Sequence, residues 1–324
     1  MYNIDIDSIQ QALTDIKQLV TDSDTQSEAH FSFQSFQNAN HSHTIAAIDG
    51  SHHNIKGMSF LFSTLRAGYL LYQNGKCIKN AIDPIKIEFI LNNDVKHMGF
   101  RAKHERYFYQ VTGESSSGNL EFDKVTERIR TLLEWDKVKY LIQTLNRDDI
   151  IIFDGSLISG EISTSHEFVR QLSEMAQSKG ITLVGLSKDT SLSIETAPIP
   201  LVLQKAAAKQ RPNQNWFTTY QDTHFVRFSK QRDLIFRVDA VLPPDLTLET
   251  VLSRIGAYCY DPATPGYPYP MQKIHDSVRI SELERNYCYD VFKKECQKLH
   301  LPKHTLQQIF SIYHNQLDKI SLGR

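Results

Sequence analysis

The sequence predicts an α/β fold in which a mixed β-sheet is flanked by helices, and two observations lead to this prediction. Runs of β-branched residues alternate with amphipathic segments of helical period, which is typical of strands connected by helices. Two of the apolar runs lead directly into the same tripeptide, Asp-Gly-Ser, at residues 49–51 and 154–156. Open α/β sheets bind ligands at the carboxyl ends of their strands, so the repeated ending predicts a functional site there. Because Asp-Gly is also common in ordinary β-turns, a single copy would carry little weight.

The chain begins with a predicted amphipathic helix, which is followed by a polar linker. Apolar side chains recur at helical spacing from Ile9 to Val20, so residues 8–21 are expected to be helical. Residues 21–42 are rich in Ser, Gln, Asn and His and show no periodicity apart from three phenylalanines, which predicts a loosely ordered segment. Residues 1–42 are therefore expected to be an N-terminal helix and linker, outside a main domain of residues 43–324.

A predicted antiparallel meander starts at the first tripeptide. The strand of residues 44–48 is followed by a long β-branched and aromatic stretch, residues 58–72. The four residues Gln-Asn-Gly-Lys at 73–76 are a strong hairpin signal, and residues 77–91 supply the returning strand. Three consecutive antiparallel strands are therefore expected.

Two crossover units follow the meander. Apolar and charged positions alternate at helical period over residues 122–145, ahead of a strand at residues 150–153. A helix at residues 165–178 and a strand at residues 181–186 repeat this unit. Three antiparallel strands followed by helix, strand, helix and strand is the order of a ribonuclease-H-like sheet. In such a sheet the first strand lies beside the strand after the first long helix, so the two tripeptide aspartates are expected to be neighbours.

The rest of the chain is predicted to contain a loop insertion, a hairpin and a helical C-terminal region. Residues 189–222 hold several prolines and Asn-Gln pairs, which indicates an irregular insertion. Residues 223–229 and 234–241 are expected to pair as a hairpin. The predicted C-terminal helices share an apolar periodicity and cover residues 246–258, 270–298 and 303–319.

Composition excludes several classes of protein. The 36 Lys and Arg residues nearly balance the 37 Asp and Glu residues, so a polyanion would have to be held by a local basic lining. The candidates for that lining are Arg66, Arg101, Lys103, Arg227, Lys230 and Arg232. The four cysteines have no Cys-x-x-Cys spacing and are expected to be free thiols of a reducing cytoplasm. The sequence shows no export signal and no apolar run of membrane-spanning length, so a cytoplasmic location without membrane contact is expected.

The two tripeptide aspartates predict a divalent metal site. Carboxylates brought side by side repel each other unless a cation lies between them, and carboxylate oxygens are the ligands that hard divalent ions prefer. Asp49 and Asp154 would supply the shared ligands. A third carboxylate is expected from the intervening helix, where Glu134 and Glu127 differ by seven residues and so share a face. Glu134 is preferred because it is nearer the strand, and Glu127 remains the alternative.

Two further side chains could assist the chemistry at such a site. Lys188 directly follows the strand of residues 181–186, where an ammonium could contact a scissile phosphate. His275 lies in a helix after a proline-stiffened turn and could be a metal ligand or position the attacking water. The histidines that flank Asp49 fit no zinc motif and are expected to be solvated; these are His41, His43, His52 and His53.

Five segments together resemble the NurA family of nucleases. They are IAAIDGSHH, IIIFDGSL, VGLSK, FRVD and GYPYPMQKIHD, and they occur in the family's order over roughly residues 43 to 285. The resemblance implies a ribonuclease-H-like core related to the Piwi domain. It places the family's metal-binding aspartates on Asp49 and Asp154 and its helix glutamate on Glu134, with Glu127 still open.

The same resemblance assigns residues from the later motifs. The family's C-terminal tyrosine and histidine fall on Tyr267 and His275, and its lysine after the next strand falls on Lys188. The implied catalytic set is therefore Asp49, Glu134, Asp154, Lys188, Tyr267 and His275, with both aspartates, the glutamate and the histidine as metal ligands. Asp239 stands where relatives often carry an acidic residue and is a secondary candidate.

The resemblance also implies an activity and partners. It implies a manganese-dependent deoxyribonuclease, with Mg²⁺ as a second possible ion, acting as a five-prime to three-prime exonuclease and as an endonuclease on single-stranded DNA. The implied assembly is a homodimer that works with a hexameric HerA-type ATPase on DNA ends, in repair or in defence against phage.

Two other functions are weighed against the nuclease. Actin-like and sugar-kinase phosphotransferases also begin with a strand ending in Asp-Gly and a hairpin, but they need a second glycine-rich hairpin and a duplicated domain, and neither is visible. A non-catalytic subunit that clamps DNA for an ATPase is the other alternative. It is disfavoured because it has no chemical reason to keep both aspartates.

Overall fold

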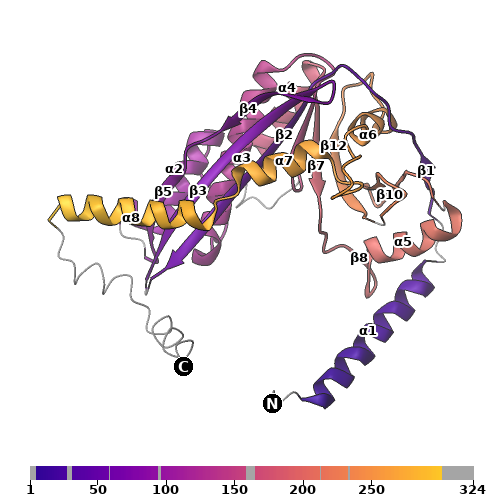
Figure 1. Ribbon diagram of the computed structural model, residues 1–324, viewed down its shortest axis with the longest axis horizontal. Helices are drawn as coiled ribbons and strands as arrows, with labels where there is room; N and C mark the ends of the chain where they lie inside the picture. The colour runs from indigo at the N-terminus through magenta and orange to yellow at the C-terminus, as the bar shows by residue number, and fades with distance from the viewer. Residues whose placement is uncertain are drawn as a thin grey trace.

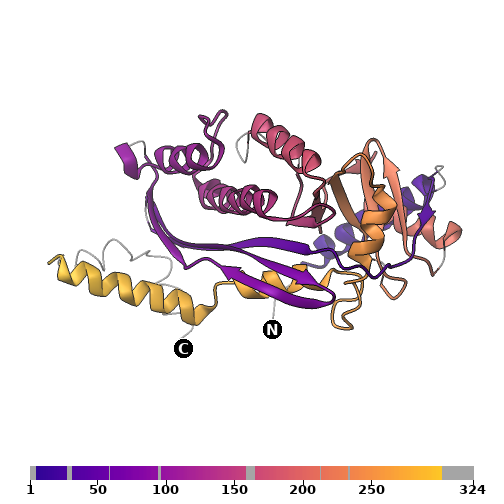
Figure 2. The ribbon, with the colours of Figure 1, turned by 90° about the horizontal axis from the view of Figure 1, so that it is seen from above.

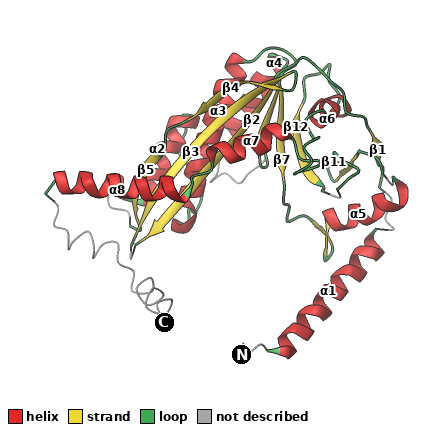
Figure 3. Ribbon diagram, viewed as in Figure 1, coloured by secondary structure: helices red, strands yellow, loops and turns green. Residues whose placement is uncertain are grey.

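The computed structural model describes residues 5–27, 31–57, 59–93, 96–157, 165–211, 213–232 and 234–300. Its main feature is a ten-stranded mixed sheet in the order β1-β10-β11-β12-β7-β6-β2-β3-β4, in which β5 also pairs with β3 (Figures 1 and 3). The pairs β2–β6 and β6–β7 are parallel, and the other pairs in this sheet are antiparallel. The predicted class, a ribonuclease-H-like mixed sheet with flanking helices, is confirmed.

Most of the twelve described strands are rich in apolar, β-branched or aromatic residues. They are β1 (Gln34–Ser35), β2 (Ile45–Lys56), β3 (Phe60–Gln73), β4 (Lys76–Ile82), β5 (Lys86–Leu91), β6 (Ile150–Asp154), β7 (Thr182–Ser187), β8 (Ser193–Ile194), β9 (Ala197–Pro198), β10 (Trp216–Tyr220), β11 (Thr223–Arg227) and β12 (Phe236–Val241). The helices are α1 (Ile6–Gln26), α2 (Phe100–Thr112), α3 (Val125–Thr144), α4 (His166–Ser178), α5 (Ile199–Gln210), α6 (Leu248–Gly256), α7 (Tyr269–Val278) and α8 (Glu282–Lys298). Two short 3₁₀ turns, Lys96–Met98 and Phe122–Lys124, precede α2 and α3.

Helices cover both faces of the sheet, as the view along its edge shows (Figure 2). One face packs against α2, α3 and α4, and the opposite face packs against α6 and α7. Side chains of β2 alternate between these two cores. Ala46 and Ile48 point toward α3, whereas Ile45 and Ala47 point toward α7. This alternation decides where the next residues of the strand point, including the first tripeptide.

The expected loose linker at residues 21–42 is wrong for the part that the structure describes. The helix α1 extends to Gln26, and β1 pairs with β10 as the outermost strand of the sheet. Phe31, Phe33 and Phe36 are all buried. Large aromatic side chains bury enough apolar surface to order a polar segment, and their near-alternate spacing fits an edge strand.

The expected loop insertion at residues 189–222 is also wrong. It contains the β8–β9 hairpin, the helix α5 and the strand β10, and α5 buries Val202 and Leu203 in a third apolar core. The prolines were misleading. Pro198 and Pro200 stand at the amino terminus of α5, where a missing N–H costs nothing.

Smaller differences concern element boundaries. The single returning strand of the meander is two strands, β4 and β5, which both pair with β3. The helix α2 was not predicted. The expected helix of residues 270–298 is broken between α7 and α8, where Ser281 forms a capping box with Glu284 that starts a new helix. The predicted helix at residues 303–319 lies outside the described residues.

Two expectations from composition can be compared directly with the fold. All four cysteines are free, and three of them are buried. Across the described part of the chain, no helix combines the length and the apolar character needed to cross a membrane.

Candidate metal centre

The sheet register brings the two tripeptide aspartates together. The parallel pairing of β2 with β6 runs from Ile45 opposite Ile150 to Ile48 opposite Phe153, so the next residues on the two strands are Asp49 and Asp154. Asp49 follows the alternation of its strand and points to the α7 face. Asp154 does the same, because Phe153 packs on the α3 side. The adjacency expected from the order of elements is present.

The strand that carries Asp49 does not end where the sequence predicted, whereas the strand that carries Asp154 does. Both strands were expected to stop at the carboxylate. The strand β6 does end at Asp154, and Gly155 takes a left-handed φ of +128°. The strand β2 instead continues through Asp49 to Lys56, because β3 pairs with it along that whole length. The first tripeptide is therefore not a turn.

Gly50 does not form the expected turn; its missing side chain leaves space next to α3. It points toward α3, and a Cβ built on it would lie 2.6 Å from Oε1 of Glu134 and 3.0 Å from Cγ of Arg130. Ordinary van der Waals contact needs more room than this. The missing side chain therefore leaves room for the Glu134 carboxylate of α3 beside the strand that carries Asp49.

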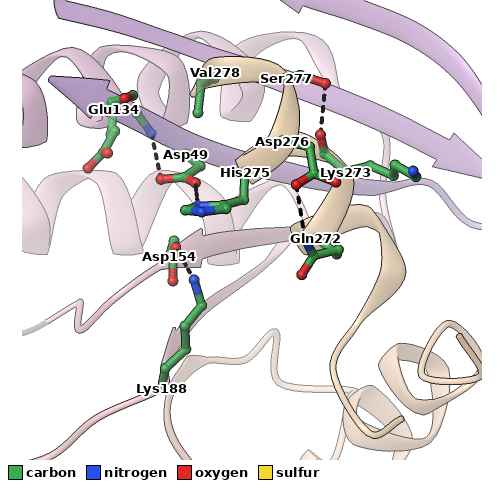
Figure 4. Close-up of polar contacts among 12 residues, drawn as sticks. Asp49, Glu134, Asp154, Lys188, Gln272, Lys273, His275, Asp276, Ser277 and Val278 are labelled. Atoms are coloured by element: carbon green, nitrogen blue, oxygen red, sulfur yellow. Dashed lines mark hydrogen bonds and ion pairs between the residues drawn. The ribbon is translucent and has the colours of Figure 1, made fainter. Parts of the chain in front are cut away.

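Asp49, Asp154 and His275 form a compact group of possible metal ligands. One ligand atom from each lies within 4.8 Å of the other two. Nδ1 of His275 lies 2.9 Å from Oδ2 of Asp49, and the close-up shows the two side chains pointing toward each other (Figure 4). The two residues come from elements far apart in the chain, since His275 is on α7. Among the described residues, no other group of three or more His, Cys, Asp or Glu places its ligand atoms this close.

Glu134 completes the acidic cluster from the α3 side, whereas Glu127 does not. Glu134 is only 2% exposed, and its Oε1 has no hydrogen-bond partner. Burial raises the pKa of Glu134 to about 8; Arg130 opposes this shift, and the charges of Asp49 and Asp154 add to it. Glu127 lies on the helix surface, where it pairs with Lys124 at 3.5 Å. Glu134 is therefore a buried acid near the two aspartates but outside the compact group of three possible ligands.

Each acidic residue of the cluster faces a separate basic group. Nζ of Lys188 donates to Oδ2 of Asp154 at 2.8 Å, as Figure 4 shows. Nη1 of Arg130 lies 3.4 Å from Oε1 of Glu134. Burial raises the pKa of Asp49, and the neighbouring charge of Asp154 raises it further. Burial and mutual repulsion therefore disfavour the charged forms of Asp49 and Glu134. A bound cation would stabilise those charged forms.

Tyr267 lies beneath Lys188 at the rim of the cluster. Its ring centroid is 5.2 Å from Nζ of Lys188 and 5.7 Å from the ring of Phe236. The Tyr267 hydroxyl is buried without a hydrogen-bond partner, and burial raises its pKa, with the charges of Asp154 and Asp49 contributing. An unpaired buried hydroxyl is a donor ready for a ligand oxygen.

Sequence reasoning missed Arg130. Its Nη1 also donates to the Gly50 carbonyl at 3.3 Å, and its pKa is raised chiefly by Glu134. The signal was present in the sequence, because residues four apart on a helix share a face and Arg130 precedes Glu134 by four.

Asp239 lies outside the ligand group and supports it. Its Oδ2 accepts hydrogen bonds from the Ser156 hydroxyl at 2.6 Å and from the Leu157 N–H at 3.0 Å. Arg237 pairs with it at 3.0 Å. These bonds hold the turn that follows Asp154, so Asp239 positions the second tripeptide.

The predicted basic lining is only partly available. Three of its six members are already paired with other groups of the protein. Arg66 pairs with Glu284 at 2.7 Å, Lys103 pairs with Glu88 at 2.6 Å, and Arg227 is buried and donates to the Gln214 carbonyl. Lys230 and Arg232 are exposed. The histidines near Asp49 do not join the ligand group. His41 contacts the Arg254 carbonyl, and His52 and His53 lie along β2 beyond the first tripeptide.

The sheet order and the carboxylates beside its central parallel pair define the class of ribonuclease-H-like proteins. Residues 43–199 match the model of a family described as the NurA domain. This segment of the chain is therefore a NurA domain, as the resemblance carried by the five motifs implied. No curated protein matches the sequence.

Two solved structures share the fold over most of the chain. The NurA nuclease from Sulfolobus solfataricus is 14% identical with a TM-score of 0.58, and the match covers 90% of this chain and 95% of that one. A structure of NurA with manganese is 10% identical with a TM-score of 0.53, covering 86% of this chain and 96% of that one. The likeness extends well beyond residues 43–199, so the fold includes the C-terminal elements that carry His275.

Proposed function

We propose that the protein is a divalent-metal-dependent deoxyribonuclease that hydrolyses phosphodiester bonds at the Asp49, Asp154 and His275 cluster. The single observation that carries the proposal is that three ligand atoms from β2, β6 and α7 lie within 4.8 Å of one another. Carboxylate and imidazole donors together suit Mn²⁺, and the carboxylates also suit Mg²⁺. The similar NurA structure with manganese supports Mn²⁺ as the preferred ion.

The donor set fits such an ion. Asp49 and Glu134 are both buried, their pKa values are raised, and Oε1 of Glu134 has no hydrogen bond. A divalent cation held by Asp49, Asp154 and His275, with Glu134 beside them, would offset this crowding of negative charge. When bound, the ion supplies Lewis acidity to the phosphodiester and lowers the pKa of water.

The surrounding side chains bind and orient the substrate. Lys188 lies 2.8 Å from Asp154 and is partly exposed, so its ammonium can contact a phosphate oxygen that approaches the aspartates. The unpaired hydroxyl of Tyr267 can donate to the same phosphate. His275 would hold the ion through Nδ1, the nitrogen that lies 2.9 Å from Oδ2 of Asp49.

The proposal extends to the substrate and the assembly. DNA is cut from ends with five-prime to three-prime polarity and internally in single strands, by a homodimer that works with a hexameric HerA-type ATPase in repair or phage defence. The family supports this extension. An exposed apolar stripe on α1, formed by Ile9, Leu13, Ile16 and Val20, supports contact with another chain.

Digestion of end-labelled DNA tests the activity. The unsubstituted chain is expected to degrade DNA with Mn²⁺ and not with EDTA, and Asp49→Ala and Asp154→Ala are expected to be inactive while keeping their circular dichroism. Asp15→Ala, an exposed carboxylate on α1, is the matched control. ATP hydrolysis without DNA cleavage would support the phosphotransferase alternative instead, and DNA binding without either activity would support the clamp.

Light scattering tests the assembly. The 37.3 kDa chain is expected to elute with twice its own mass. Leu13→Glu with Ile16→Glu is expected to weaken assembly or binding of the cognate ATPase, because it places charge in the α1 stripe. A monomer that still binds the ATPase and cleaves DNA at full rate would contradict the proposed homodimer.

A further inference from the structure

A polar groove lies on the same edge of the sheet as the acidic cluster. The pairing of β12 with β7 sets Arg237 opposite Ser187, and Asp154 pairs with Leu186 on the other side of β7. The antiparallel pairing continues outward through β11 and β10 to β1. Three loops therefore meet the sheet at the edge where Asp154 and Lys188 lie. One follows β1, one follows β11, and the third leads into β10.

The groove between these segments has a volume of about 1270 Å³. Six of its sixteen lining residues are carboxamides, and they come from three separate segments: Gln37, Asn38, Asn213, Gln214, Asn215 and Gln231. Arg211 and Lys230 are its cations, and Glu249 is its one acidic residue. A carboxamide offers both donors and acceptors, as the edges of nucleobases do, whereas a groove built for phosphate alone would be lined mainly by basic groups.

An exposed aromatic ring completes the groove. Tyr260 is 61% exposed and lines the groove beside Cys259, while one contact of its ring, with Tyr269, keeps it oriented. Exposed aromatic rings stack on unpaired bases. The ring stands at the start of the segment that leads to Gly266 and Tyr267.

The groove is joined to the acidic cluster by this segment. A Cβ on Gly266 would lie 3.1 Å from Cβ of Ser229, which lines the groove. The next residue, Tyr267, lies under Lys188. A strand whose phosphate reaches Lys188 and Asp154 can therefore continue over Ser229 into the groove.

We propose that this groove binds the unpaired bases of the nucleic-acid strand whose phosphate is held at the acidic cluster, and so provides the binding site for the single-strand activity proposed above. The inference rests on the proposed nuclease function. In a duplex the base edges and faces that the carboxamides and Tyr260 would contact are already paired and stacked. Arg211 and Lys230 contact the backbone of the bound strand.

Binding without metal tests the groove separately from cleavage. Fluorescence anisotropy with the full chain, EDTA and a labelled single strand of about 15 nucleotides is expected to show at least about fivefold weaker binding for Tyr260→Ala. Asn215→Ala combined with Gln231→Ala is expected to weaken it similarly. Tyr109→Ala is the matched control, because Tyr109 on α2 is also 61% exposed and lies outside the groove. The same strand annealed to its complement is expected to bind more weakly to the unsubstituted chain.

Cross-linking identifies the contact directly. A strand carrying 5-iododeoxyuridine is expected to cross-link to Tyr260 or to residues 228–231, as mass spectrometry of the digested adduct reports. Equal affinities of Tyr260→Ala and Tyr109→Ala, equal binding of single strand and duplex, or cross-links confined to other surfaces would each overturn the proposal. If the nuclease function fails instead, Mn²⁺ supports no cleavage by the unsubstituted chain, while binding in EDTA still reports on the groove.

Discussion

The two Asp-Gly-Ser segments share all three residues but take different structures. Residues 49–51 remain inside β2, which continues because β3 pairs with it on to Lys56. Residues 154–156 end β6, whose pairing with β7 stops at Asp154, and Asp239 on β12 holds the turn that follows. The neighbouring strands decide whether the same tripeptide is a strand or a turn.

The glycine of each segment also meets a different physical need. Gly50 provides room, because Glu134 occupies the space of a side chain. Gly155 provides backbone freedom, since its φ is +128° and the nearest atom to an added Cβ is 3.5 Å away. The same tripeptide thus places an aspartate at the site in both copies, although its glycine provides space in one copy and a positive φ in the other.

The largest effect is expected at the aspartates. Loss of a group that only supports a metal ligand already lowers metal affinity or activity by about 10- to 100-fold, so Asp49→Asn and Asp154→Asn should each reduce Mn²⁺-dependent cleavage by more than about 100-fold. Their effects on the metal-free protein should differ. Asp49→Asn removes a buried charge and should not lower the melting temperature, whereas Asp154→Asn leaves Lys188 without its partner. Activity retained within tenfold in either variant would contradict a shared metal site.

Alanine substitutions at Gly50 and Gly155 should have different effects, because Gly50 provides space for Glu134 whereas Gly155 needs its positive φ. Gly50→Ala should displace Glu134 and lower Mn²⁺ affinity by about tenfold or more, as isothermal titration measures. Gly155→Ala should mainly lower stability, by about 1–3 kcal/mol for a strained backbone, as urea denaturation measures. In a Glu134→Ala background the stability cost of Gly50→Ala should be smaller, because the carboxylate 2.6 Å from the added Cβ is gone, although Arg130 and the Arg66 carbonyl remain close. Additive costs in that double variant would show that Glu134 does not fill this space.

The raised pKa of Glu134 predicts a pH dependence of stability in EDTA. The folded state holds this proton up to about pH 8, whereas the unfolded chain releases it near the ordinary glutamate pKa of 4.5, so stability should fall as pH rises between these values. The slope from one such group is at most about 1.4 kcal/mol per pH unit. Glu134→Gln has no proton to lose and should flatten the dependence of the melting temperature between pH 5 and 8. An unchanged slope in that variant would rule out Glu134 as its source.

The smallest effect is expected from the support of the second tripeptide. Asp239→Asn weakens the bonds to Ser156 and Leu157 and the ion pair with Arg237, and should cost about 1–2 kcal/mol of unfolding free energy. Mn²⁺ affinity should fall by less than tenfold, because Asp154 remains. A loss as large as that of Asp154→Asn would mean that Asp239 is itself a ligand.

Much of the fold followed from local pattern. The crossover helices and strands have strong periodicity, and the hairpin turn at residues 73–76 has φ above zero at Asn74 and Gly75, as that turn chemistry requires. The errors arose where burial overrode composition. Phe31, Phe33 and Phe36 order a polar segment, and α5 begins at two of the prolines that indicated an irregular insertion.

The candidate site shows the same division. Asp49 and Asp154 could be identified because strand order alone makes them neighbours. The sequence could not separate Glu134 from Glu127, since the two are seven residues apart on one helix, whereas the structure places Glu134 beside Gly50 and pairs Glu127 with Lys124. The contact of Arg130 with the Gly50 carbonyl and the lack of a hydrogen-bond partner for the Tyr267 hydroxyl could be seen only in the folded structure.

By itself, the sequence determined which chemical groups are present and the order of the elements that carry them, because periodicity and turn residues act over a few positions. The tertiary structure alone decided which groups meet. His275 reaches Asp49 across 226 positions of the chain through the packing of α7 on β2. Side-chain alternation in the paired strands set both aspartates on that face, and one missing side chain left room for Glu134 on the other.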